Sequence, residues 1–296
     1  MPRVQTGSVK IEYVRDGNAA APAFLLLMGA GEQLVMWPRT LISALTDAGF
    51  QVIRLDYRDA GLSTKFDAFG PVDLGALVAA LMAGESVSVP YTLSDMARDA
   101  IAVLDDCGIA RAHIAGLSLG GMIAQTIAIE HSGRVSSLTS IASTTGDHHL
   151  PPPNPAIVMQ MFALPSDAPP EAWIAARGTA MTAMQGTVYQ ATAEEIREAA
   201  AESVRRNLSP AGVTRELAAS IVSPPRGEGL KQFKRPALVI HGTADQVMSP
   251  ACGAYTAECL PNGTFVPIEG MGHGFSNALM PVWAEHLIAV ARRASV

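Results

Sequence analysis

Short apolar runs recur along the chain and alternate with longer amphipathic stretches. The run AFLLLMG, residues 23–29, is apolar throughout, which is typical of a central strand covered on both faces. Other runs compatible with a β-strand are KIEYVRDG (10–17), QVIRLDY (51–57), RAHIAG (111–116), RVSSLTSIAS (134–143), RPALVIHG (235–242) and GTFVPIEG (263–270). The hydrophobic pattern therefore predicts a strand at each of these runs.

Helical periodicity fills the stretches between several of these strands. Helices are expected over residues 38–48, closed by Gly49, and from Thr92, a favourable capping residue, to Gly108. The apolar stretch 122–130 and the final stretch 281–293 also indicate helices. Strands that alternate with helices form a mostly parallel, doubly wound sheet with helices on both faces. The fold class predicted is therefore α/β.

This alternation stops between residues 145 and 234, where no clear strand is found. The segment opens with PPPNP and continues with helical stretches such as TAEEIREAAAESVRRN. We predict a core domain in two parts, residues 1–144 and 235–296, with a helical cap inserted at 145–234. A smaller departure from the alternation spans residues 71–90.

The composition restricts the classes of function. Hydrophobic residues make up 49% of the chain and charged residues 16%, as in a globular protein, and the net charge is −6. A negative charge argues against nucleic acid or an anionic membrane as partner, and no run is apolar enough to span a bilayer. The start of the sequence lacks the apolar region of a signal peptide, and the three cysteines have no CxxC spacing. We expect reduced thiols and a cytoplasmic protein, as a monomer or homodimer.

The stretch Gly116-Leu117-Ser118-Leu119-Gly120 lies between a predicted strand and a predicted helix. A serine nucleophile on a sharp strand-to-helix turn has this pattern, since flanking glycines leave room where a Cβ would clash. The alternative is a glycine-rich turn without chemistry. A serine hydroxyl needs a general base within reach, and the base needs an orienting acid.

Both partners follow later strands of the same predicted sheet. Asp245 comes just after PALVIHG, and His273 comes in the glycine-flanked loop after TFVPIEG. The order Ser118, Asp245, His273 is that of an α/β-hydrolase triad. Asp147, which follows the strand after the nucleophile helix, is a rival for the acid. His148 and His149 next to it lack further ligands at a metal-binding spacing, so a solvated loop is the expected interpretation.

These motifs together resemble the α/β-hydrolase superfamily over nearly the whole chain. The resemblance is carried by LLLMGAG, LDYRDAGLS, GLSLGG, and the pair HGTADQVMSP and GMGH. Within the superfamily, LMGAGEQLVMWP and DYRDAGLST are similar to the aclacinomycin methylesterase group. Members of that group cleave a methyl ester on a polyketide aglycone.

The resemblance also implies an oxyanion hole built from the backbone amides of Ala30 and Leu119. Many relatives have His-Gly where this chain has Met28-Gly29. Backbone donors depend little on side chains, so Met28 does not remove the hole. Arg58 and Asp59 stand in a loop motif typical of the methylesterase-like group, and we interpret both as structural.

The predicted function is a cofactor-free and metal-free serine hydrolase of carboxylic esters, acting on an apolar, bulky, polyketide-like small molecule. Alternatives on the same fold are a lactonase, a C–C bond hydrolase, a perhydrolase or a non-catalytic small-molecule receptor. The candidates for the substrate pocket are Gly29, Glu32, Trp37, Met159, Phe162, Met181 and Met184. Packing is the alternative role for Glu32, Trp37 and the methionines.

Overall fold

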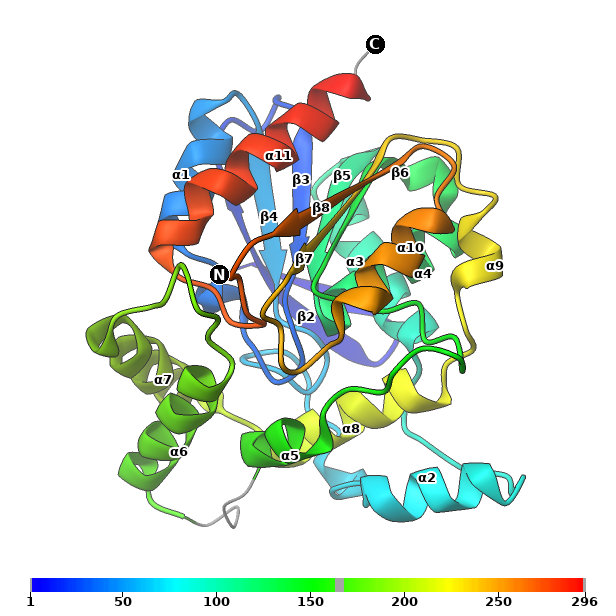
Figure 1. Ribbon diagram of the computed structural model, residues 1–296, viewed down its shortest axis with the longest axis vertical. Coiled ribbons are helices and arrows are strands. Elements are labelled where there is room, and N and C mark those ends of the chain that lie inside the picture. Colours follow the sequence, from blue (N-terminus) through cyan, green and yellow to red (C-terminus); the bar gives the residue numbers. More distant parts are fainter. Residues whose placement is uncertain (1, 163–167, 295–296) are drawn as a thin grey trace.

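A single eight-stranded sheet forms the centre of the computed structural model, which describes residues 2–162 and 168–294, with only the backbone at 161–162 (Figure 1). The strand order is β1-β2-β4-β3-β5-β6-β7-β8. The strands are β1 (Arg3–Thr6), β2 (Val9–Asp16), β3 (Ala23–Leu27), β4 (Gln51–Leu55), β5 (Ala112–Leu117), β6 (Val135–Ile141), β7 (Ala237–Gly242) and β8 (Gly263–Ile268). Strands β3 to β8 run parallel, and β1 and β2 form an antiparallel ribbon at one edge. The predicted α/β class and all seven predicted strands are confirmed.

Strand β1 is the strand that the sequence pattern missed. Its four residues, RVQT, alternate between exposed and half-buried, so they form no continuous apolar run. Within the described residues the strand pairs with β2 alone, in the register that joins Arg3 to Glu12 and Thr6 to Val9. A short edge strand of this kind is stabilised by its neighbour rather than by its own burial.

Helices cover both faces of the sheet. On one face, α1 (Arg39–Asp47) and α11 (Met280–Arg293) pack over Phe24 and Leu26 of β3. On the other face, α3 (Leu93–Asp106), α4 (Leu119–Glu130) and α10 (Pro250–Glu258) pack over Leu25 and Leu27. Successive residues of β3 thus point into different cores, which explains why its sequence is apolar throughout.

Among the described residues, five α-helices lie between β6 and β7 in the chain, and they are called the inserted helices below. They are α5 (Pro155–Val158), α6 (Pro170–Ala183), α7 (Ala193–Asn207), α8 (Pro210–Val222) and α9 (Gly227–Leu230). Figure 1 shows α5 to α8 grouped beyond the lower end of the sheet. Among the described residues from 145 to 234 no strand occurs, as the sequence pattern indicates. The division of the chain into a core and a cap stays a prediction.

Helix α2 (Leu74–Met82) forms most of the smaller departure between residues 71 and 90. Its sequence, LGALVAALM, has no charged residue, yet only Leu77 is buried. In Figure 1 it projects from the body of the molecule below α8, with which it makes contact. Within the described ranges, no helix combines the length and apolar character needed to cross a membrane.

Candidate active site

The strand-to-helix turn at Ser118 has the strained geometry that its glycines suggest. Ser118 follows β5 directly, caps α4, and has φ 54° and ψ −116°. A Cβ on Gly116 would lie 2.0 Å from the carbonyl oxygen of Gly120, and a Cβ on Gly120 would lie 2.1 Å from that of Leu27. Both glycines are therefore required by backbone packing. Helix α4 begins at Leu119, three residues before the predicted start, because the Gly120-Gly121 pair belongs to the helix rather than to a loop.

His273 joins the other two residues of the predicted triad. Its Nε2 lies 3.0 Å from Oγ of Ser118, and its Nδ1 lies 2.8 Å from Oδ2 of Asp245. His273 belongs to the loop after β8, and Asp245 to the loop after β7. Parallel strands bring these loops to the same edge of the sheet as Ser118. The three residues thus form one continuous hydrogen-bonded chain.

Asp245 is held as a carboxylate by several donors. The amides of Val247 and Met248 each donate to Oδ1 at 2.9 Å, and the buried His241 lies 3.3 Å from Oδ2. Burial by itself raises the pKa of Asp245, but His273, His241 and the backbone outweigh it and hold this pKa well below its usual range. An ionised Asp245 favours the Nδ1–H tautomer of His273, which leaves Nε2 free to accept a proton from Ser118.

The loop after β3 lies against Ser118 as an oxyanion hole requires. A Cβ built on Gly29 would be 3.6 Å from Cβ of Ser118. Within the described part of the chain, the backbone amides of Ala30 and Leu119 donate to no protein group. The Tyr57 hydroxyl donates to the Met28 carbonyl at 2.8 Å and steadies this loop, a contact that sequence reasoning missed. Amides without a protein acceptor, one in this loop and one directly after Ser118, are donors of the kind that a developing oxyanion needs.

Two of the candidates for the substrate pocket, Glu32 and Trp37, make contacts with other parts of the protein. Both carboxylate oxygens of Glu32 accept from Arg177 of α6 at 2.8 Å. The Trp37 side chain is 2% exposed and belongs to the hydrophobic core under α1 and α11. The burial of Trp37 favours its alternative role in packing. Glu32 links the loop after β3 to helix α6.

The other pocket candidates lie in the inserted helices. Met184 contacts the loop of His273 through its backbone, since its carbonyl accepts from the amide of Gly274 at 2.8 Å. Met181 is half-buried against the core, and Met159 is 56% exposed. The side chain of Phe162 lies outside the described residues.

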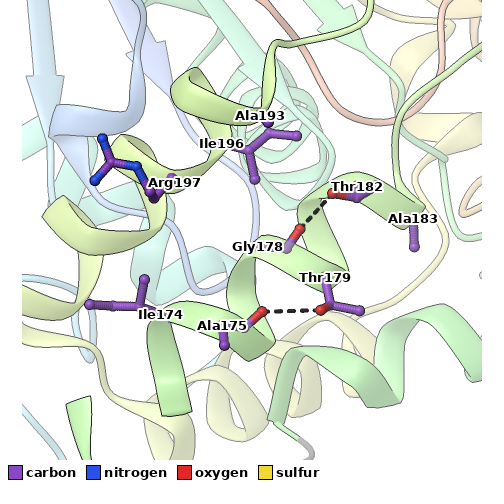
Figure 2. Close-up of a pocket in the computed structure, with 9 residues that line it drawn as sticks. All are labelled: Ile174, Ala175, Gly178, Thr179, Thr182, Ala183, Ala193, Ile196 and Arg197. Atoms are coloured by element: carbon purple, nitrogen blue, oxygen red, sulfur yellow. Dashed lines mark hydrogen bonds between the residues drawn. The ribbon is translucent and has the colours of Figure 1, made fainter. Parts of the chain in front are cut away.

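A separate cavity of about 600 Å³ lies between α6 and α7 (Figure 2). Its lining consists of Ile174, Ala175, Gly178, Thr179, Thr182, Ala183, Ala193, Ile196 and Arg197. Neither the triad nor any predicted pocket residue belongs to this lining. The cavity is therefore distinct from the site around Ser118.

The rival acid, Asp147, is engaged elsewhere. Its Oδ2 accepts from the Thr145 hydroxyl at 2.6 Å and from the Gly227 amide at 3.1 Å. His148 and His149 are exposed on the same loop. Across the described ranges, no group of three or more His, Cys, Asp or Glu side chains is arranged to hold a metal ion. Because Asp147 binds Thr145 and Gly227, the carboxylate that pairs with His273 is that of Asp245.

Arg58 and Asp59 are bound within the protein, as their structural interpretation expects. Arg58 donates to both carboxylate oxygens of Asp99. Asp59, at φ 71°, accepts two hydrogen bonds of 2.7 Å from Arg215 of α8 and one from Tyr91. The Asp59–Arg215 pair is fully buried, so it fixes α8 against the loop after β4.

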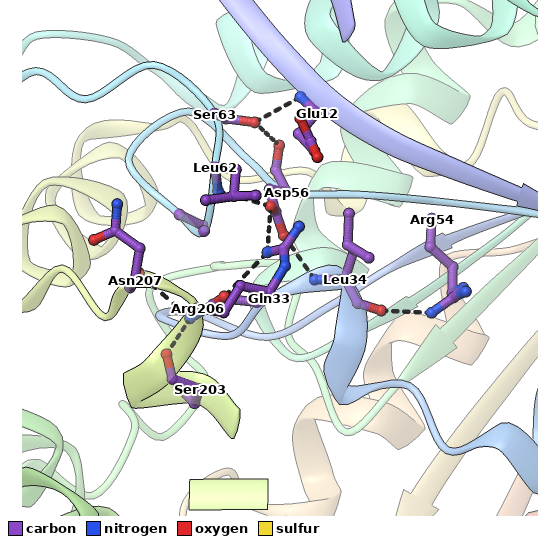
Figure 3. A network of polar contacts seen from close by, with 12 residues as sticks. Glu12, Gln33, Leu34, Arg54, Asp56, Leu62, Ser63, Ser203, Arg206 and Asn207 are labelled. Atoms are coloured by element: carbon purple, nitrogen blue, oxygen red, sulfur yellow. Dashed lines mark hydrogen bonds and ion pairs between the residues drawn. The ribbon is translucent and has the colours of Figure 1, made fainter. Parts of the chain in front are cut away.

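A second network joins α7 to the same region of the core (Figure 3). Asp56 accepts from Arg206 of α7 and from the amides of Leu34 and Leu62. Gln33 donates to the Ser203 carbonyl of α7 at 2.7 Å. Each of α6, α7 and α8 therefore places a buried arginine on a carboxylate of the loops after β3 and β4.

Known proteins share both the sequence pattern and the architecture. The chain is 28% identical to the rhodomycin D methylesterase DauP of Streptomyces sp. (strain C5), over 95% of this chain and 94% of the relative. It has the same identity and coverage with the rhodomycin D methylesterase DnrP of Streptomyces peucetius.

Solved structures give the same picture of the fold. The enol-lactonase from Burkholderia xenovorans LB400 superposes with a TM-score of 0.72 and 20% identity over the whole of both chains. The 2-hydroxy-6-oxo-6-phenylhexa-2,4-dienoate hydrolase from Rhodococcus sp. strain RHA1 gives a TM-score of 0.72 and 19% identity, over 99% of this chain and 98% of that one. The model of the alpha/beta hydrolase fold family matches residues 22–276. The chain therefore belongs to the α/β hydrolase fold family.

Proposed function

We propose that this protein is a serine hydrolase of carboxylic esters. The observation that carries the proposal is the hydrogen-bonded chain from Ser118 through His273 to Asp245, with the serine on a strained turn between a strand and a helix. The backbone amides of Ala30 and Leu119 complete the set of groups that acyl transfer needs.

In the first half of the reaction, Ser118 Oγ attacks the ester carbonyl carbon while its proton passes to Nε2 of His273. The electron pair of the carbonyl bond moves to oxygen, where the Ala30 and Leu119 amides donate to it. Asp245 stabilises the imidazolium that forms, because its carboxylate stays ionised. The tetrahedral intermediate then collapses, and the alcohol leaves with the proton from His273.

In the second half, a water molecule takes the place of the alcohol. His273 accepts a proton from the water as its oxygen attacks the acyl carbon on Ser118. Collapse of this second intermediate returns the proton to Oγ of Ser118 and releases the carboxylic acid. Each step uses only these residues and water.

The substrate class that we propose is a methyl ester of an apolar, bulky small molecule. Full-length similarity to two proteins named rhodomycin D methylesterases supports this choice. Met184 ends α6 and contacts the loop of His273 through its carbonyl, and Met181 lies three residues before it on the same helix. Flexible thioether side chains suit a large apolar ligand.

The test is hydrolysis of p-nitrophenyl acetate, butyrate and octanoate by the wild type and by Ser118→Ala. We expect turnover by the wild type and a loss of about 10⁴-fold or more in the variant, because removal of a triad nucleophile has effects of this size. The preferred chain length then measures the acyl pocket. Labelling with a fluorophosphonate, followed by mass spectrometry, should place one adduct on Ser118.

Two outcomes would contradict the proposal. A folded wild type that gives no adduct on Ser118 and no ester turnover would favour a small-molecule receptor on this fold. Ser118-dependent turnover of a lactone or of a vinylogous diketone, without ester turnover, would instead assign a lactonase or a C–C bond hydrolase.

A further inference from the structure

Helix α8 reaches the oxyanion loop through one buried carboxyl group. The backbone amide of Gly31 donates to Oε2 of Glu216 at 2.7 Å, across 185 positions of the sequence. Gly31 directly follows Ala30, whose amide is the proposed oxyanion donor. Glu216 therefore holds the peptide unit that links Ala30 to Gly31.

A second side chain of α8 contacts the same glycine. Gly31 has φ +71°, and a Cβ at this position would lie 2.6 Å from Cγ2 of Val213. Val213 and Glu216 are three residues apart, so they share one face of the helix. The loop thus has no room to move toward α8, and its amide is tied to the helix.

Glu216 is an unusual side chain for such a buried place. It is 1% exposed, and within the described part of the chain its Oε1 has no hydrogen-bond partner. Burial, together with the nearby carboxylates of Asp59 and Glu32, raises the pKa of Glu216 well above its usual range, although Gly31 and Lys65 oppose this. This shift favours the uncharged form of the carboxyl, whose Oε2 accepts from the Gly31 amide. A half-satisfied polar group in the interior costs stability, which indicates a role other than stability.

We propose that Glu216 is a positioning residue for the oxyanion hole. By accepting from the Gly31 amide it fixes the orientation of the preceding residue, Ala30, so that an inserted helix contributes to transition-state stabilisation. This role deepens the proposed ester hydrolysis and rests on it.

The rest of α8 is anchored without Glu216. Thr214 accepts from the amide of Val72 at 2.9 Å, and Arg215 makes its buried pair with Asp59. Removal of the Glu216 carboxyl should therefore leave the helix in place and release only the oxyanion loop. Thr214→Val offers a matched control, since it removes a neighbouring contact between α8 and the core that does not involve this loop.

The experiment compares the wild type, Glu216→Met, Glu216→Gln and Thr214→Val with p-nitrophenyl butyrate as substrate and an alkyl trifluoromethyl ketone as inhibitor. The ketone adds to the serine and places an oxyanion in the hole. We expect Glu216→Met to lower kcat by about tenfold to a hundredfold, somewhat less than the loss of an oxyanion donor, with KM within about twofold. The inhibition constant of the ketone should rise in proportion. Glu216→Gln, which keeps a neutral acceptor, should restore kcat to within about threefold, and Thr214→Val should resemble the wild type.

Each other outcome overturns a stated part of the reasoning. Unchanged kcat in Glu216→Met, or an equal loss of kcat in Thr214→Val, would overturn the positioning role. A Glu216→Gln variant as defective as Glu216→Met would overturn the claim that a neutral oxygen acceptor is sufficient at this position. If Glu216→Met does not fold, Gly31→Ala offers a second test, because its Cβ would meet Val213 and push the loop away from α8. Normal kcat in that variant would overturn the role. A wild type without Ser118-dependent turnover overturns the proposed function first, and this role with it.

Discussion

Ser118 holds backbone angles, φ 54° and ψ −116°, that lie outside the regions open to residues with a Cβ. Strain at one such residue costs about 1–3 kcal/mol. Replacement by glycine removes this strain, but glycine also has more freedom in the unfolded chain, which costs about 0.5–1 kcal/mol relative to alanine. The net effect should be that Ser118→Gly is more stable than Ser118→Ala by about 1 kcal/mol.

The two variants form a matched pair because both lose the hydrogen bond between Oγ and His273, and both should be inactive. Urea denaturation followed by tryptophan fluorescence measures their free energies of unfolding, and 1 kcal/mol corresponds to a shift in Tm of roughly 2 °C in a chain of this size. At an ordinary position the glycine variant would be the less stable one by up to about 1 kcal/mol. A glycine variant no more stable than the alanine variant would therefore refute strain at the nucleophile.

Two further predictions concern buried ionisable side chains. Burial lowers the pKa of His113 to about 4, below its value of about 6.5 in the unfolded chain. The stability that the neutral imidazole contributes is therefore fully present above pH 6.5 and is lost as the pH falls toward 4. The loss in the free energy of unfolding should be on the order of 3 kcal/mol. Urea denaturation at pH 7.5 and 4.5 should show a smaller loss in His113→Asn than in the wild type, and equal losses would contradict the assignment. Asp59→Ala should cost about 3–5 kcal/mol, because it removes the buried carboxylate of Arg215 and leaves this buried charge with the largely exposed Asp67, 3.3 Å away. The double variant with Arg215→Met should recover part of that loss. A single variant within about 1 kcal/mol of the wild type in thermal or urea unfolding would exclude this reading of the pair.

The sheet, and the meeting of Ser118, Asp245 and His273 at one of its edges, could be predicted because their signals are local. Each parallel strand is buried on both faces and therefore appears as an apolar run, and Gly116 and Gly120 are needed by close backbone contacts on either side of Ser118. Asp245 and His273 each follow such a run directly. Once the runs are assigned to one parallel sheet, topology alone brings these residues to the same edge.

The contacts around the oxyanion loop could not be predicted in this way. Glu32 stands in the sequence as a polar residue near the site, and only its pairing with Arg177, 145 positions away, shows that it serves the inserted helices. Glu216 gives no sign of burial, since it lies in a helix of mixed polarity and meets Gly31 only through tertiary packing. Contacts between residues so far apart in the sequence depend on how the helices pack against the core. The hydrophobic periodicity of the chain does not predict that packing.

The arginines of the inserted helices also bear on the order in which the chain can fold. Their partners Glu32, Asp56 and Asp59 belong to the first fifth of the sequence, and the arginines follow 145, 150 and 156 positions later. During synthesis these carboxylates remain without their cations until the ribosome has passed the inserted helices. Burial of an unpaired carboxylate is unfavourable, so the loops after β3 and β4 cannot close early on the nascent chain. The edge of the sheet that carries Ser118 is therefore completed late, in a step that joins the two ends of a long chain segment.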